Sequence, residues 1–155
     1  MENQHTNDNN YRHLVRVAST DLVGSKSILY SLTKIKGVST SFANAILSVS
    51  DVSKDKKTGL LEDKEIEQLN DIVLDPKKYN IPGWIFNRNK DYESGENKHL
   101  IGGDLAFTKD NDLKRLKKIK SYRGLRSAWG LTTRGQRTKS NFRKAKGKLT
   151  GKRRK

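Results

Sequence analysis

The sequence contains no cysteine, which excludes disulfides, thiolate metal sites and cysteine nucleophiles. No apolar run approaches the roughly 18 residues of a membrane span, and the polar residues 1–10 lack the features of a secretory signal. We expect these ten residues to form a disordered leader. Hydrophobic residues make up 32% of the chain, against about 45–50% in typical globular domains. The 155 residues therefore predict one domain with a modest core, plus a tail.

Acidic residues are absent from the last third of the chain. From Leu113 to Lys155 there are 18 Lys or Arg and no Asp or Glu, whereas residues 1–112 hold the other 15 basic residues and all 17 acidic ones. The front part is thus near −2 and the tail near +18, which accounts for the net charge of +16. A block of this charge density repels itself and builds no core. It becomes ordered against a polyanion, whose counterions it displaces.

The composition of the tail separates three interpretations. A solubility segment is better served by acidic residues than by basic ones, and the tail lacks the apolar face of a helix that lies on a membrane. Arg-Gly steps at 123–124 and 134–135, with Tyr122, Trp129 and Phe142 between the charges, favour RNA. Arg binds phosphate through two parallel hydrogen bonds, Gly permits close approach, and aromatic rings stack on bases.

Two short helices are predicted in the front part. The first covers residues 25–36, with Ser25 as N-cap and Gly37 as the stop signal. Ser39 or the threonine after it caps the second, which runs to about residue 50. Both carry a single apolar stripe. The hairpin at 35–39 fits a phosphate site at the N-terminus of the second helix and a plain turn between helices equally well.

Two further helices are predicted beyond a polar loop. The third covers 62–74 and ends at Asp75-Pro76. The fourth covers 108–121, with a narrow seam of Leu113, Leu116 and Ile119 among lysines. Between them, Trp84 lies in an apolar cluster, and such a residue more often belongs to a core than to a base-stacking surface. The three histidines are scattered and have no metal-ligand spacing.

The chain resembles the universal family of the thirteenth small-subunit ribosomal protein, which is counted as the eighteenth in eukaryotes. The motifs that carry the resemblance are Leu32 to Val38 (LTKIKGV), Ile81-Pro82 with Trp84, residues 117–126 (KKIKSYRGLR) and residues 134–139 (RGQRTK). The insert around 90–103 resembles the archaeal and eukaryotic branch. The similarity covers about residues 13–144, and the last two motifs at this spacing are specific to the family.

The resemblance implies an all-α protein with a helical domain of the helix-two-turns-helix type and an extended basic C-terminal tail. The body would cover 11–121 and the tail 122–155. The family is a structural constituent of the head of the small ribosomal subunit, in the cytoplasm, and is not an enzyme. No cofactor or metal is expected. The implied partners are small-subunit ribosomal RNA, transfer RNA, the neighbouring nineteenth head protein and a large-subunit protein across an inter-subunit bridge.

The resemblance and the charge pattern together name the candidate binding residues. Those expected to contact ribosomal RNA are Lys36, Gly37, Ser39, Lys117, Lys118, Lys120, Tyr122, Arg123, Gly124, Arg126, Arg134, Gly135, Gln136, Arg137, Thr138, Lys139, Arg143 and Lys144. Those expected near transfer RNA are Lys148, Lys152, Arg153, Arg154 and Lys155.

Two positions depart from the family pattern. Ser39 stands where the hairpin usually has a second Gly, so its Cβ restricts backbone approach to phosphate, although its hydroxyl can cap or donate. Ser127 stands where many relatives have His, so any base contact by that ring is lost.

Two other classes of protein share the helical hairpin. A DNA-compacting protein would bind any duplex with a steep salt dependence, but the sequence shows no dimerisation signal and no groove-reading helix. A repair glycosylase needs a catalytic acid or amine in a base-sized pocket, and no residues here form such a set. A ribosomal protein would instead prefer structured RNA of the subunit head.

Overall fold

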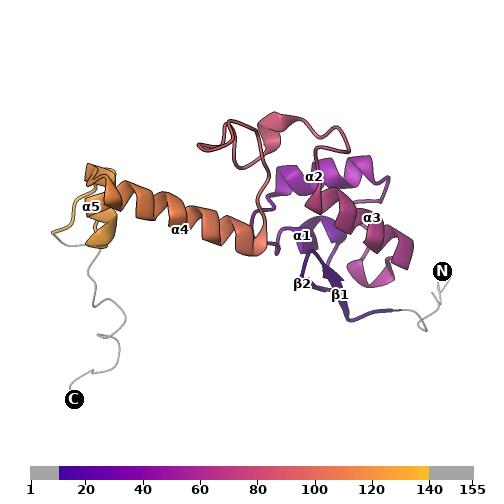
Figure 1. The fold of residues 1–155 in the computed structure, drawn as a ribbon. Helices are drawn as coiled ribbons and strands as arrows, with labels where there is room; N and C mark the ends of the chain where they lie inside the picture. Colours follow the sequence, from indigo (N-terminus) through magenta and orange to yellow (C-terminus); the bar gives the residue numbers. More distant parts are fainter. Residues whose placement is uncertain (1–10, 140–155) are drawn as a thin grey trace, which may run out of the picture. The chain divides into compact units, whose positions relative to one another are not determined.

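The computed structural model describes residues 11–139, which fall into two units divided between Leu105 and Ala106 (Figure 1). The division lies inside a helix, earlier in the chain than the expected boundary after Ser121 between body and tail. The physical reason is that the buried core ends at Phe86, and none of the helical residues that follow adds to it. The expected leader, residues 1–10, lies outside the described residues.

The first unit begins with a two-stranded antiparallel sheet, which an all-α fold does not contain. Strand β1 (Leu14–Val17) pairs with β2 (Thr20–Val23), and Val15 lies opposite Leu22. The strands are joined at Ala18 and Ser19, both of which have positive φ. Two successive residues in the left-handed conformation form a tight turn, and the twist of this turn matches that of the paired strands. The fold is therefore mostly helical, with a small sheet.

Three helices pack with this sheet to form the core of the first unit (Figure 1). Helix α1 covers only Ile28–Leu32, and its N-cap is Ser27 instead of the expected Ser25. Helices α2 (Thr40–Val49) and α3 (Asp63–Leu74) confirm the predicted second and third helices within a residue or two. A 3-10 turn, Thr58–Leu60, lies in the segment predicted as a loop.

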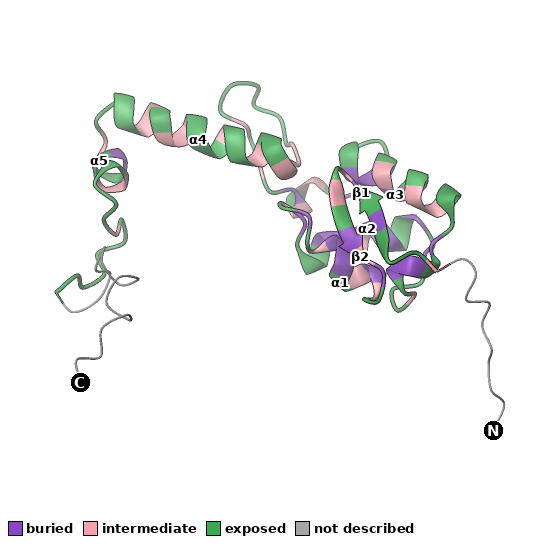
Figure 2. Ribbon diagram, turned by 90° about the horizontal axis from the view of Figure 1, so that it is seen from below, coloured by how far each residue is buried: buried purple, intermediate pink, exposed green. Residues whose placement is uncertain are grey.

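The core consists of apolar side chains from the sheet, the three helices and the segments around them. Figure 2 shows most of the buried residues gathered in this unit. The fully buried large members are Val17, Leu22, Ile28, Leu32, Ile35, Phe42, Ile46, Leu47, Leu69, Ile72 and Val73. The spacing of these residues within α2 and α3 is the helical one that the apolar stripes predicted, although Val49 at the end of α2 is exposed.

Residues 75–101 form an irregular segment that is held together by hydrogen bonds and ion pairs of its own. The Asn87 amide donates to the carbonyl of Leu100 at 2.6 Å and accepts from its N–H at 2.9 Å. Arg88 and Lys98 exchange backbone hydrogen bonds, and both side chains pair with Asp91. The expectation that Trp84 belongs to the core is wrong: it lies in the 3-10 turn Gly83–Ile85 and is 77% exposed.

The second unit holds most of helix α4 (Gly102–Lys118) and helix α5 (Tyr122–Ala128). Helix α4 begins at Gly102, six residues before the predicted start at Thr108. Helix α5 lies where an extended tail was predicted. Sequence periodicity gives little signal there because the segment is short and basic, yet Ser121 caps it by accepting a hydrogen bond from the N–H of Gly124.

Candidate nucleic-acid interface

The helical hairpin places its glycine against the protein's own backbone. Gly37 has φ of +105°, and a Cβ at this position would overlap the carbonyl oxygen of Leu100. Next to this contact in the chain, the N–H of Gly102 donates to the carbonyl of Lys36 at 2.8 Å. The geometry therefore gives Gly37 a structural role in the turn between α1 and α2, which corresponds to one of the two interpretations left open by the sequence.

The other two candidate residues of the hairpin remain at the surface. Lys36 and Ser39 are both exposed. The Ser39 hydroxyl accepts a hydrogen bond from the N–H of Phe42 at 3.3 Å, so it acts as the N-cap of α2. The capping role proposed for Ser39 is thus confirmed. The lone pair of the Ser39 oxygen that accepts from Phe42 is therefore not available to a ligand.

His99 is a feature of the hairpin region that the sequence pattern did not reveal. Its ring stacks on Phe42 with centroids 3.7 Å apart and meets Phe86 edge-on at 5.9 Å. Both ring nitrogens are buried, and neither has a hydrogen-bond partner among residues 11–139. Burial lowers the pKa of His99 to about 4, because loss of solvent disfavours the charged form of the ring. The ring is therefore a neutral packing element.

The end of helix α4 presents a basic surface. Lys117, Lys118 and Lys120 are exposed. In the predicted apolar seam, Leu113 and Leu116 are half-buried, whereas Ile119 is 65% exposed. Lysines at this end of a helix are also favoured by the helix dipole. Lys117 and Lys118 at the end of α4, and Lys120 just after it, are therefore available to a polyanion.

A close backbone contact joins the end of α4 to α5. Gly124 is buried, and a Cβ there would overlap the carbonyl group of Leu116. The N–H and hydroxyl of Ser121 both donate to that same carbonyl, at 3.2 and 3.0 Å. Gly124, expected to permit close approach to RNA, thus permits close approach of α5 to α4. We call this junction of Leu116, Ser121 and Gly124 the α4–α5 corner.

The remaining candidates of the second unit lie around and beyond α5. Arg126 is half-buried, and its Nε donates to the carbonyl of Thr132 at 2.9 Å, which folds the chain back onto α5. Gly135 has a positive φ with open space around it. The exposed candidates are Tyr122, Arg123, Arg134, Gly135, Gln136, Arg137, Thr138 and Lys139. Arg143, Lys144, Lys148, Lys152, Arg153, Arg154, Lys155 and Phe142 lie outside the described residues.

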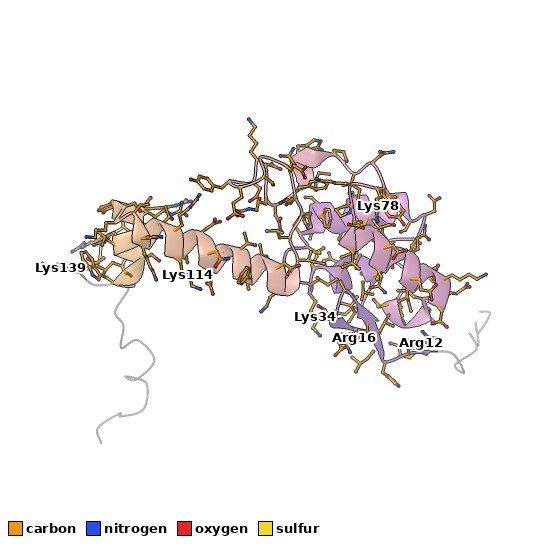
Figure 3. All side chains as sticks on the ribbon, viewed as in Figure 1. Arg12, Arg16, Lys34, Lys78, Lys114 and Lys139 are labelled. Atoms are coloured by element: carbon orange, nitrogen blue, oxygen red, sulfur yellow. The ribbon has the colours of Figure 1, made fainter. Side chains whose placement is uncertain are left out.

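The charge of the described part of this unit is strongly positive. Residues 106–139 contain eleven Lys or Arg and only Asp110 and Asp112 as acids, a net charge of +9. An ion pair in this range joins Arg115 to Asp112 at 4.0 Å. Figure 3 shows Lys114 and Lys139 in this unit, and Arg12, Arg16, Lys34 and Lys78 in the first. A surface of this kind attracts polyanions and releases their counterions on binding.

In the part of the chain that the structure describes, no helix is long and apolar enough to cross a membrane. The fold and the surface together define a small, mostly helical protein that carries a concentrated basic segment. Comparison with known proteins identifies the family. Residues 16–144 match the family described as ribosomal protein S13/S18, so the chain belongs to this family of small-subunit ribosomal proteins. It is a structural protein and not an enzyme.

Two relatives illustrate the extent of the similarity. The small ribosomal subunit protein uS13 of Methanothermobacter thermautotrophicus is 46% identical over 145 residues, which cover 94% of this chain and 96% of the relative. The protein of the same name from Methanocaldococcus jannaschii is 45% identical over 134 residues, or 86% of this chain and 89% of the relative. The family predicted from the sequence motifs is therefore confirmed.

Proposed function

We propose that this protein binds ribosomal RNA in the head of the small subunit, chiefly through the second unit and the residues that follow it. The observation that carries the proposal is the net charge of +9 over residues 106–139, where most of the basic side chains are exposed. Membership of the S13/S18 family supplies the ribosomal context. Arginine forks and lysine ammonium groups would neutralise phosphates, and the counterions released would drive binding.

The finer roles follow from the family resemblance. The end of the tail, with Lys148, Lys152, Arg153, Arg154 and Lys155, approaches transfer RNA. The protein pairs with the nineteenth head protein and contributes to a bridge with a large-subunit protein. It acts in the cytoplasm as a part of the ribosome.

The salt dependence of binding tests the assignment of RNA contacts. The full chain is titrated with small subunits that were assembled without it, at several salt concentrations. For Arg134→Gln with Arg137→Gln, the slope of log K against log salt should fall by about 1.4–1.8, which corresponds to two phosphate contacts. The matched control is Lys54→Gln with Lys64→Gln, two exposed lysines of the first unit.

The control pair removes the same net charge, so an effect of overall charge alone would change both slopes equally. That outcome would contradict the proposed location of the RNA contacts. A wild-type chain that binds neither these subunits nor their RNA would contradict the ribosomal function itself.

A further inference from the structure

A second surface that combines basic and aromatic side chains lies on the first unit, around helix α1. A hollow of about 230 Å³ is lined by Val23, Lys26, Tyr30, Ser31, Thr33 and Lys34. We call it the Tyr30 hollow. Tyr30 is 66% exposed. This volume is smaller than the roughly 300–1,000 Å³ of pockets that enclose small-molecule ligands. The hollow therefore has room for a single flat group.

The positive charge of the Tyr30 hollow is not balanced by acidic side chains. Lys26 has no carboxylate within ion-pair distance among the described residues, and the Lys34 ammonium donates to the backbone carbonyl of Asp21 at 2.6 Å. An ammonium group has three donors, so two remain for a ligand. Two full charges flanking one ring therefore favour an anionic partner with an aromatic face.

Three other hollows of the same unit differ in this respect. One holds the ion pair of Arg12 with Asp63, and another the pair of Lys77 with Glu96. The third hollow is lined by Lys77, Lys78 and Lys98, and each of these lysines forms an ion pair with a carboxylate. Lys78, for example, pairs with Asp75. The uncompensated charge thus distinguishes the Tyr30 hollow from these neighbours and is not a general property of a basic protein.

The wall of the hollow is held in place by hydrogen bonds. The Ser31 hydroxyl donates to the carbonyl of Val23 at 3.3 Å and accepts from the hydroxyl of Thr58 at 2.8 Å. The Thr33 hydroxyl donates to the carbonyl of Tyr30 at 2.6 Å. Because the backbone under the ring is fixed, binding would immobilise few groups beyond the Tyr30 and lysine side chains, which limits its entropic cost.

We infer that the Tyr30 hollow binds an unpaired nucleotide of RNA, with the base stacked on the Tyr30 ring and the adjacent phosphates on Lys26 and Lys34. Base–aromatic stacking with flanking cations is the general mode by which proteins hold single-stranded nucleic acid. This inference rests on the proposed function, since the RNA is that of the small subunit. It adds a contact on the body that is separate from the basic segment of residues 106–139.

The test uses full-length variants bound to small subunits assembled without this chain. Tyr30→Leu should raise Kd by about 5- to 150-fold, the range of one stacking interaction. Tyr30→Phe keeps the ring and should bind like the wild type. Tyr92→Leu is the matched control, because Tyr92 is 73% exposed but lies beside Asp91 and Glu93. Its Kd should stay within about twofold of the wild-type value, as expected for a residue outside the contact.

Chemical probing of the RNA in the same complexes locates the contact. One short unpaired stretch should be protected by the wild type, Tyr30→Phe and Tyr92→Leu, and should become reactive with Tyr30→Leu. Thermal unfolding of the free variants checks that Tyr30→Leu is folded, and rescue by Tyr30→Phe excludes a general folding defect.

Equal affinity and equal protection for Tyr30→Leu and the wild type would overturn the inference while leaving the proposed function intact. Loss of affinity with no change in RNA reactivity would assign the hollow to a protein neighbour and would equally overturn it. Failure of the wild type to bind the subunits is the separate outcome that contradicts the proposed function.

Discussion

At the scale of single residues, Gly37 shows how a feature read as a binding element serves the fold. Its positive φ and its contact with the Leu100 carbonyl both require the absence of a side chain. We expect Gly37→Ala to lower the free energy of unfolding by about 1–3 kcal/mol. The control is Gly103→Ala, at an open helical position with ordinary φ, which should leave stability unchanged or raise it by up to about 1 kcal/mol. Urea denaturation measures both, and equal effects would refute the role given to Gly37.

His99 gives the protein a pH dependence that its surface charges do not explain. The pKa is about 4 in the folded protein, against an ordinary value of 6.5, so the unfolded chain takes up the proton first. Stability due to the neutral ring is therefore complete above about pH 6.5 and is lost as the pH falls toward 4. The loss should be on the order of 1–2 kcal/mol once solvent screening of this partly exposed group is allowed for.

His99→Phe should flatten the stability profile between pH 6.5 and 4, because the ring packing is kept and the titrating group is removed. His13→Gln, at an exposed position, should retain the wild-type profile. Urea midpoints measured at half-unit pH intervals give the comparison. The contribution of Asp91 to stability is lost at lower pH, since the hydrogen bond from Arg88 holds the pKa of that carboxyl below its usual value of 3.8. A slope that persists in His99→Phe between pH 6.5 and 4.5 would contradict this account.

At the scale of elements, helices and strands were predicted well where the local sequence carries a strong signal, and poorly where it does not. Helices α2 and α3 were predicted well because each has a long apolar stripe and a cap, Ser39 for α2 and the capping box of Glu62 and Glu65 for α3. The pairing of β1 with β2 was not predicted because the turn between them uses Ala18 and Ser19 in left-handed conformations, without the Gly or Asn that normally marks such turns.

The elements around the candidate site were harder to predict, since non-local contacts define them. Trp84 has an apolar sequence environment, but the turn at Gly83–Ile85 points it outward. Helix α5 has no apolar stripe of its own and depends on the α4–α5 corner. The candidate basic residues within the described part of the chain are all exposed except Arg126, because charge at such density has no buried alternative. Their partners within the chain, such as Thr132 for Arg126, required the structure.

The α4–α5 corner leads to a prediction about helix α5. Gly124→Ala places a Cβ on the Leu116 carbonyl, so α5 must move away and the hydrogen bonds of Ser121 must weaken. Amide hydrogen exchange within α5 should accelerate about fivefold or more, which corresponds to a loss of at least about 1 kcal/mol of local stability. Arg123→Ala, at an exposed position of the same helix, is the control. Unchanged exchange in Gly124→Ala would show that the corner does not hold α5.

At the scale of the whole molecule, stability and charge reside in different parts of the chain. Every buried apolar residue in the described part of the chain lies between Val15 and Phe86, whereas residues 106–139 have a net charge of +9. Folding is driven by burial of apolar area and binding of polyanions by counterion release. The two properties should therefore be separable by cutting the chain at the boundary between the units.

A chain that ends at Leu105 should unfold cooperatively, with a urea midpoint close to that of the full protein, because the entire described core is retained. The same chain should lose most of its affinity for small-subunit RNA, since it lacks the +9 of residues 106–139 and all the basic residues that follow. Denaturation followed by circular dichroism gives the midpoint, and a filter-binding titration gives the affinity. A shortened chain with no cooperative transition would mean that the second unit contributes to the core. If it kept the full affinity, the principal RNA contacts would have to lie on the first unit, and the Tyr30 hollow would then be the first place to locate them.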